Sequence, residues 1–318
     1  MNKTVNPEHG IEKKPSKIRG RLLRGVVLLL LSFLVCYGIF ALFIPKKDTM
    51  PFFEAKETPL VIAHQGGNML APSSTFAAFD KAVELGVDVL EYDLHITKDG
   101  QLVLIHDPTV DRTTNGQGRV EDLTLEEIQA LDAGYTFTDL SGELSYRGQG
   151  LYIPTLEEMF QRYGQMLHNI EMKNTNSDEH YEEIYEKLWT LIQKYNMEDK
   201  VLIFSFDHQM IKDFQQLSEG RVAVSAGRAE IIKFVAFHKL LLSPFYRTEV
   251  QALQIPVESD GFNLADATLT KGAKRHHMQL HYWTINDEEA MRALLELGAD
   301  GIITDRPDLL MEIIADYK

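Results

Sequence analysis

Short β-branched runs alternate with helical patterns from residue 59 onward, and this alternation limits the possible folds of the chain more than any other feature. Strands that alternate with helices indicate βα units and a parallel sheet. Eight such strands joined by crossover helices predict an α/β fold, the (β/α)8 TIM barrel, which needs roughly 250 residues. The 318 residues of the chain can hold one such domain and a smaller N-terminal appendage.

The predicted strands are 60–64, 87–93, 167–173, 201–205, 221–225, 261–264, 279–284 and 301–304. The predicted helices between them are 74–85, 156–163, 178–195, 208–217, 229–242, 265–274 and 287–297. The helix at 229–242 is strongly apolar on one face, which favours packing on the outside of the barrel. An interfacial helix that lies on a membrane is the alternative.

One apolar run, 102–106, does not fit as a parallel barrel strand. It follows Asp93 too closely for the crossover of a dozen or more residues that a parallel return requires. The intervening Asp99-Gly100 pair is instead typical of a β-hairpin turn. We therefore expect an antiparallel return that places His106 close to opposite Asp93, at the C-terminal rim where barrel enzymes hold their active sites. Residues 108–150 are predicted to form a small insertion over that rim, either a substrate cap or a plain surface insertion.

Residues 25–44 carry no charge and are long enough to cross the hydrocarbon core of a bilayer as a helix. Lys and Arg residues are concentrated before this segment, which predicts a single-pass protein of the cell membrane with a cytoplasmic N-terminus and an extracellular barrel domain. A cleaved signal peptide is the alternative, but the apolar run is longer than a typical signal core. The predicted parts are a basic tail (1–24), a transmembrane helix (25–44), a linker (45–58) and the barrel (59–318).

Charge is spread unevenly between these parts. The chain has a net charge of −15, yet residues 1–48 hold nine Lys and Arg against three acidic residues. The remainder is strongly acidic and lacks the positive surface that nucleic-acid binding needs. Cys36 is the one cysteine, so no disulfide can form within the chain.

Three carboxylates stand at or near the ends of predicted strands. Glu91 and Asp93 are two residues apart, so both side chains point to the same face of their strand. Two carboxylates on one face repel each other unless a cation joins them, and hard oxygen ligands suit Ca²⁺ or Mg²⁺ rather than zinc. Glu171, near the end of the next barrel strand, is the third candidate ligand. Ion-paired surface acids are the alternative.

Two histidines are the candidate acid–base pair. His64 ends the first strand, beside Gly66-Gly67, where the backbone can come close to a ligand. His106 is carried by the hairpin. Two imidazoles beside a metal-bound phosphodiester can exchange acid and base roles near neutral pH.

Lys173 and Trp283 are the other candidate ligand contacts. Lys173 could neutralise a phosphate oxygen in the transition state, or form a salt bridge to one of the glutamates. Trp283 could form a pocket wall against a glycerol or other apolar part of a ligand, with core packing as the alternative. Asp305 and Arg306, after the last strand, are predicted to close the barrel.

Taken together and in this order, several short motifs resemble the glycerophosphodiester phosphodiesterase family over residues 60 to about 310. The motifs are His64-Gln65-Gly66-Gly67, Glu91-x-Asp93, Thr97-x-Asp99-Gly100, His106-Asp107, Ile170-Glu171-Met172-Lys173, Trp283-Thr284-x-Asn286 and Thr304-Asp305-x-Pro307. The resemblance implies a phosphoric diester hydrolase that releases sn-glycerol 3-phosphate and an alcohol from a glycerophosphodiester. It also implies the following roles: catalysis by His64 and His106, binding of one divalent cation (Ca²⁺ or Mg²⁺) by Glu91, Asp93 and Glu171, and phosphate contact by Lys173.

Two departures from the family pattern concern substrate binding. Gln65 stands where the family usually has arginine, and Pro72-Ser73-Ser74-Thr75 stands where it usually has Pro-Glu-Asn-Thr. Arginine binds phosphate with a charged fork, whereas glutamine only hydrogen-bonds, so phosphate affinity or substrate choice is expected to differ.

Other functions stay open. The substrate could be a lysophospholipid or a glycerophosphate polymer of a cell wall, or the barrel could bind such ligands without catalysis, which Gln65 would support. An unrelated metal-dependent barrel enzyme is disfavoured because His106 has no obvious role there. The sequence predicts no oligomeric state.

Overall fold

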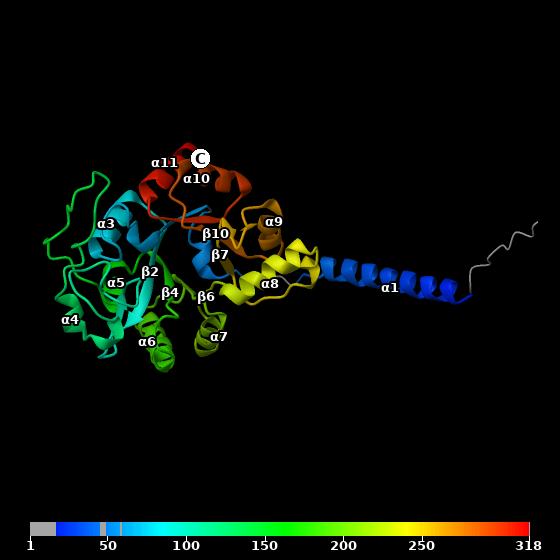
Figure 1. Cartoon of the computed structure of the whole chain (residues 1–318), viewed down its shortest axis with the longest axis horizontal. Coiled ribbons are helices and arrows are strands. Elements are labelled where there is room, and N and C mark those ends of the chain that lie inside the picture. The colour runs from blue at the N-terminus through cyan, green and yellow to red at the C-terminus, as the bar shows by residue number, and fades with distance from the viewer. Residues whose placement is uncertain (1–16, 45–48, 58, 318) are drawn as a thin grey trace, which may run out of the picture. The chain divides into compact units, whose positions relative to one another are not determined.

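The computed structural model describes residues 17–44, 49–57 and 59–317, and the chain divides into two units, Met1–Ile44 and Pro45–Lys318. The described part of the first unit is dominated by the helix α1 (Lys17–Leu42), drawn in blue in Figure 1. Its segment Arg21–Leu42 is long and apolar enough to cross a membrane, although a signal sequence would have the same properties. The predicted basic tail falls largely on residues 1–16, which lie outside the described residues, as do residues 45–48 and 58 of the predicted linker. The described part of that linker contains a short helix at 51–54.

The second unit is built on a barrel of eight parallel strands. They follow the order β6-β5-β4-β2-β1-β11-β10-β7, and a bridge between Ser225 and Ala252 joins the two ends of this order. The strands are β1 (Leu60–Ala63), β2 (Val89–Ile96), β4 (Leu167–Met172), β5 (Val201–Phe204), β6 (Ala223–Val224), β7 (Ala252–Pro256), β10 (Gln279–Trp283) and β11 (Gly301–Thr304). The predicted barrel is therefore confirmed.

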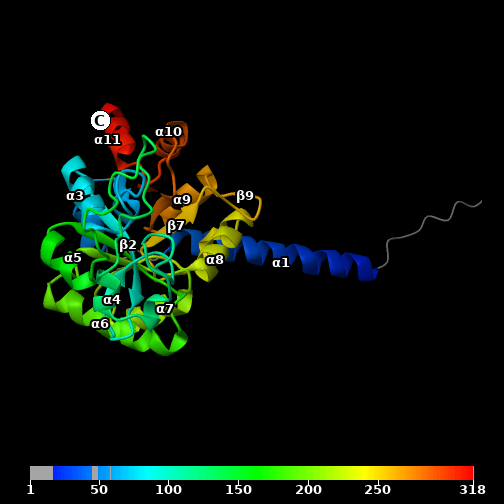
Figure 2. The ribbon, with the colours of Figure 1, turned by 60° about the vertical axis from the view of Figure 1, so that its left-hand side comes forward.

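Helices surround the strands on the outside, as Figure 2 shows. Asp207, Asp266 and Asp287 begin three of them, and their carboxylates accept backbone N–H groups that the first turn leaves free. Thr155 and Glu158 form a reciprocal capping box at another. The helices are α2 (Pro51–Glu54), α3 (Phe76–Leu85), α4 (Leu125–Gln129), α5 (Leu156–Tyr163), α6 (Tyr181–Lys194), α7 (His208–Leu217), α8 (Arg228–Lys239), α9 (Ala267–Arg275), α10 (Glu288–Leu297) and α11 (Pro307–Tyr317).

The predicted strand at 261–264 is wrong. Phe262–Asn263 forms β9, which pairs antiparallel with β8 (Glu258–Ser259) in a small hairpin outside the barrel. Asp260 and Gly261 both have positive φ, as a type I′ hairpin turn requires, so Gly261 belongs to the turn. The barrel strand of this region is β7, which the sequence analysis missed because Gln254 and Pro256 interrupt its apolar character.

The predicted hairpin after the second strand is confirmed. β3 (Leu102–Leu104) pairs antiparallel with the end of β2, and Leu94 lies opposite Leu104. The N–H of Ile105 donates to the carbonyl oxygen of Asp93 over 3.1 Å, so His106 lies one residue beyond the position opposite Asp93. The chain after β3 has an apolar cluster of its own, which includes Val110, Val120 and Ile128. The hairpin therefore delivers His106 to the C-terminal rim, beside the ends of the parallel strands.

Candidate active site

The C-terminal ends of β2 and β4 bring the three predicted carboxylates together. Asp93 and Glu171 are direct register partners on these neighbouring strands, and Glu91 precedes Asp93 on the same strand face. All three side chains are buried, with exposed fractions of 3% for Glu91, 1% for Asp93 and 4% for Glu171. Buried charges are strongly destabilising unless they are paired, so this cluster needs positive charge.

Lys173 supplies part of that charge. Its Nζ atom lies 3.3 Å from Asp93 Oδ1 and 3.2 Å from Glu171 Oε1. The salt bridge to a glutamate that the sequence analysis gave as an alternative is therefore present with Glu171. A second salt bridge, to Asp93, was not predicted. Asp93 Oδ2 is buried and has no hydrogen-bond partner, so the cluster keeps a free acceptor.

The carboxylates differ in their affinity for protons. Burial and the nearby Asp93 raise the pKa of Glu91 to about 7. Burial also raises the pKa of Glu171 well above its usual range. Burial opposes ionisation of Asp93, but Lys173, followed by His106 and His64, outweighs it and lowers the pKa of that carboxyl. Both histidines are thus close enough to Asp93 to interact with its charge.

The Nδ1 side of the His64 imidazole is held by residues that are distant in the sequence. Its Nδ1 atom lies 2.5 Å from Asp305 Oδ1, and Asn286 Nδ2 donates to Asp305 Oδ2 over 2.7 Å. Burial opposes protonation of His64, but Glu91, and then Asp305, outweighs it and raises the pKa of the imidazole to about 9. Asp305 therefore orients His64, which the sequence analysis did not foresee. A carboxylate directly after the last strand was the available signal.

His106 has a similar support from its own neighbourhood. Its Nδ1 atom lies 2.8 Å from Asp107 Oδ1, and Arg112 contacts both oxygens of that carboxylate at 2.6 and 3.0 Å. The hydrogen bond from Arg112 outweighs burial and lowers the pKa of Asp107 to about 2. Each candidate histidine thus has a carboxylate at Nδ1, which fixes the tautomer and leaves Nε2 as the nitrogen for proton exchange. Asp107 and Arg112 were missed as supports.

Gln65 is buried and held in place by several polar groups. Its backbone N–H donates to Glu91 Oε2 over 2.8 Å. Its side-chain oxygen accepts from Ser73 Oγ at 2.5 Å and from Asn68 Nδ2 at 3.1 Å. Its Nε2 atom lies 3.2 Å from His64 Nε2. The two departures from the family pattern, at positions 65 and 73, are therefore in direct contact.

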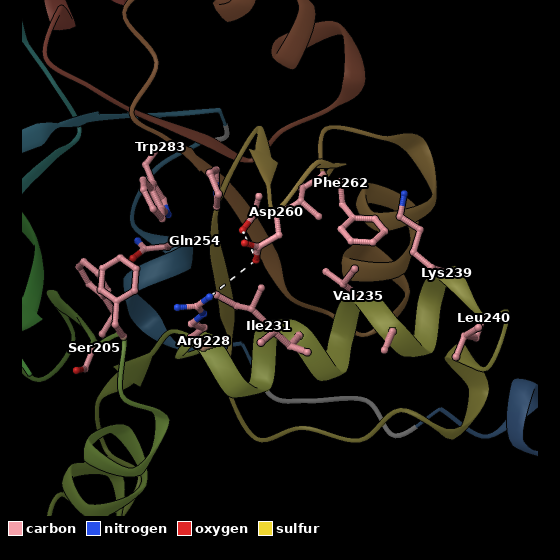
Figure 3. Close-up of a pocket in the computed structure, with 18 residues that line it drawn as sticks. Ser205, Arg228, Ile231, Val235, Lys239, Leu240, Gln254, Asp260, Phe262 and Trp283 are labelled. Atoms are coloured by element: carbon pink, nitrogen blue, oxygen red, sulfur yellow. Dashed lines mark hydrogen bonds and ion pairs between the residues drawn. The ribbon is translucent and has the colours of Figure 1, made fainter.

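Trp283 lies on the other side of the rim. Its ring is partly buried, and it meets Phe206 edge-on, with ring centroids 5.7 Å apart. It lines an open groove of about 660 Å³ that continues along α8, shown in Figure 3. The structure thus favours the pocket wall over complete core packing for this residue.

Comparison with known proteins gives the same family as the sequence motifs. The pattern of the Glycerophosphoryl diester phosphodiesterase family matches residues 64–309. The chain belongs to this family. A glycerophosphodiester phosphodiesterase of Caldanaerobacter subterraneus is 39% identical over 263 residues, which are 80% of this chain and 97% of that protein. A human lysophospholipase D is 27% identical over 91% of this chain and 97% of its own length.

A solved structure extends the likeness. A phosphodiesterase of Oleispira antarctica, in complex with the product sn-glycerol-3-phosphate, superposes with a TM-score of 0.66 at 25% identity, over 81% of this chain and 97% of its own. Membership of the family makes this chain a phosphoric diester hydrolase of glycerophosphodiesters. The Caldanaerobacter and Oleispira proteins contain little beyond the matching region.

The residues present suit a divalent cation by their chemistry. Three buried carboxylates, one with a free oxygen in Asp93 Oδ2, are the hard ligands that Ca²⁺ and Mg²⁺ prefer. Within 17–44, 49–57 and 59–317, however, no group of three or more His, Cys, Asp or Glu side chains has a ready-made arrangement for a metal ion. Lys173 lies between two of the carboxylates, Asp93 and Glu171.

Proposed function

We propose that this protein is a membrane-anchored glycerophosphodiester phosphodiesterase that releases sn-glycerol 3-phosphate and an alcohol, with one Ca²⁺ or Mg²⁺ ion. The observation that carries the proposal is the pair of histidines, His64 and His106. Each has a carboxylate at Nδ1, and both lie close enough to Asp93 to lower its pKa. The product found in the Oleispira antarctica structure supports the same reaction.

The two histidines divide the proton transfers between them. The oxygen of a water molecule attacks phosphorus while one imidazole accepts the proton of that water. The other imidazole donates a proton to the alcohol oxygen as its bond to phosphorus breaks. Asp305 and Asp107 hold the imidazoles in the tautomer that exposes Nε2, and they stabilise each imidazolium that forms.

Charge and hydrogen bonding place the phosphodiester. Lys173 contacts a phosphate oxygen and offsets its negative charge. The side-chain oxygen of Gln65 already accepts two hydrogen bonds, so its NH₂ group is the part that donates to phosphate. Trp283 packs against the alcohol or glycerol part of the substrate.

Glu91, Asp93 and Glu171 are the residues that would hold the cation, with Asp93 Oδ2 as the free acceptor. The bound cation would supply positive charge to the transferring phosphoryl group. The apolar segment of α1 would anchor the protein, with the N-terminus in the cytoplasm, because basic residues are concentrated before it.

The proposal is tested with the full-length protein after removal of metal with EDTA. Glycerophosphocholine is added with Ca²⁺ or Mg²⁺, and released glycerol 3-phosphate is coupled to its dehydrogenase. We expect turnover that depends on one of the two cations and is lost in Glu171→Gln. Cation-independent turnover would refute the assigned metal site, and no turnover with any common glycerophosphodiester would favour a binding protein.

A further inference from the structure

A mostly apolar groove leaves the rim next to the carboxylate cluster. Phe204 at the end of β5 lines the groove and is the register partner of Glu171. Trp283 and Gln254, from β10 and β7, line the same end. The groove therefore begins at the end of the strand next to the one that carries Glu171, and its volume of about 660 Å³ is within the usual range of ligand pockets.

The groove then runs between α8 and the β8–β9 hairpin, as Figure 3 shows. Ile231, Val235 and Lys239 follow the spacing of one helix face on α8, and Phe262 faces them from the hairpin. An exposed ion pair between Arg228 and Asp260, 3.8 Å apart, joins the two walls. With 12 residues α8 is roughly 18 Å long.

The apolar side chains of this groove are open to solvent. Ile232 is 59% exposed and Phe262 is 66% exposed. Continuous exposed apolar surface marks a binding site more often than a plain surface. A polymeric glycerophosphate is charged and hydroxylated in every repeat and gains little from such walls. A hydrocarbon chain fits them, and one leaflet of a bilayer, which one acyl chain spans, is roughly 15 Å thick.

We propose that this groove binds the acyl chain of a lysophospholipid, a glycerophosphodiester with one fatty acyl group, while its phosphodiester lies at the Glu171 end. The inference rests on the proposed function, because the chemistry is the same. Water adds to phosphorus, the bond from phosphorus to the head-group alcohol breaks, and that alcohol leaves with a proton. The products are a monoacyl glycerol phosphate and the free alcohol.

The test compares substrates that differ only in the acyl chain. Residues 49–318 are used without detergent, since detergent would compete for the groove. Pro45–Lys318 form one compact unit, and two relatives contain little beyond the region that matches it. Glycerophosphocholine is compared with lysophosphatidylcholines of increasing chain length below their critical micelle concentrations. We expect kcat/KM to rise by up to about threefold to fourfold per buried methylene, and then to level off when the groove is full.

A matched pair of variants assigns the effect to the groove. Ile232 lines the groove and Leu140 does not, yet both are 59% exposed. Ile232→Asp is expected to lower kcat/KM for the long-chain substrate by about tenfold or more and to leave glycerophosphocholine within twofold, which also shows that the variant folds. Leu140→Asp is expected to change neither.

The outcomes separate the two proposals. Cleavage of glycerophosphocholine with no dependence on chain length, or equal losses in both variants, would overturn the acyl groove alone. Cleavage of neither substrate would overturn the proposed function and the groove with it. Cleavage of lysophospholipids only, lost in Ile232→Asp, would support the groove and narrow the substrate class.

Discussion

The two halves of the barrel rim differ in the kind of side chain that they bury and expose. At the ends of β1, β2 and β4, charged side chains are buried, and Lys173 and His64 offset the negative charge of the carboxylates. Beside β5, β7 and α8, apolar side chains such as Ile232 and Phe262 are exposed instead. Burying charge is unfavourable without a counter-charge, and exposing apolar surface is unfavourable without a ligand.

This difference indicates a separate role in substrate binding for each half of the rim. In the proposed function, the polar half acts on the phosphodiester, which every substrate of the family shares. In the proposed groove, the apolar half contacts the part of the substrate that varies. Changes in the polar half should therefore reduce turnover of every substrate, whereas changes in the groove should affect acylated substrates only.

The largest effect is expected from His106→Ala. Loss of a general acid or base lowers kcat by about 10²- to 10⁴-fold, and here it should do so for glycerophosphocholine and lysophospholipid alike. Steady-state kinetics on both substrates measure it, with His180→Ala, outside the site, as the control. Retained turnover in His106→Ala would remove the acid–base pair from the account.

Acid should weaken the barrel under both halves of the rim. Burial lowers the pKa of His168 on β4 to about 4 and that of His281 on β10 to about 3. Below pH 6.5 these histidines become protonated in the unfolded chain but stay neutral in the folded protein. The free energy of unfolding therefore falls as pH falls toward 4. The expected loss is about 2 kcal/mol per histidine between pH 7 and 4.5.

Urea unfolding at the two pH values measures this loss. His168→Gln should reduce the difference between pH 7 and 4.5, whereas His277→Gln, at an exposed position, should not. An unchanged pH dependence in His168→Gln would mean that this histidine is not held neutral in the folded protein.

Asp305→Asn is expected to reduce turnover less than loss of a histidine does. A hydrogen bond to a charged group contributes about 1.5 to 3 kcal/mol, so kcat should fall by roughly 10- to 100-fold for all substrates. The pH dependence of kcat should also change, because Asp305 helps to raise the pKa of His64. An unchanged profile with unchanged kcat would show that the contact is only structural.

The smallest effect is expected at Gln65. Gln65→Arg should lower KM severalfold by adding a charged phosphate donor. Because Ser73 contacts Gln65, the double change Gln65→Arg with Ser73→Glu should lower KM further by orienting the new guanidinium. Steady-state kinetics of the single and double variants measure KM. A higher KM in both variants would show that the neutral residues Gln65 and Ser73 are adapted to this substrate.

Local signals in the sequence predicted much of this fold. The Asp99-Gly100 pair correctly indicated the hairpin that carries His106, since its meaning depends only on neighbouring residues. The same pair at Asp260-Gly261 was overlooked, and a barrel strand was placed there instead of at β7.

The supports of the site were harder to predict. Asp305 meets His64 across 241 positions of sequence, so only barrel closure brings them together. The groove could not be predicted from the sequence, because it forms only where the hairpin β8–β9 lies opposite α8. The apolar face of α8 alone was predictable. The site residues at strand ends could be predicted from the sequence, whereas contacts between loops that are distant in the sequence could not.

Phosphorus NMR of glycerophosphocholine incubated with the full-length protein and its cation tests the central claim most directly. We predict that the diester resonance is replaced by that of glycerol 3-phosphate, and that His106→Ala leaves the diester intact. Formation of choline phosphate, or an unchanged diester with the wild-type protein, would contradict the account.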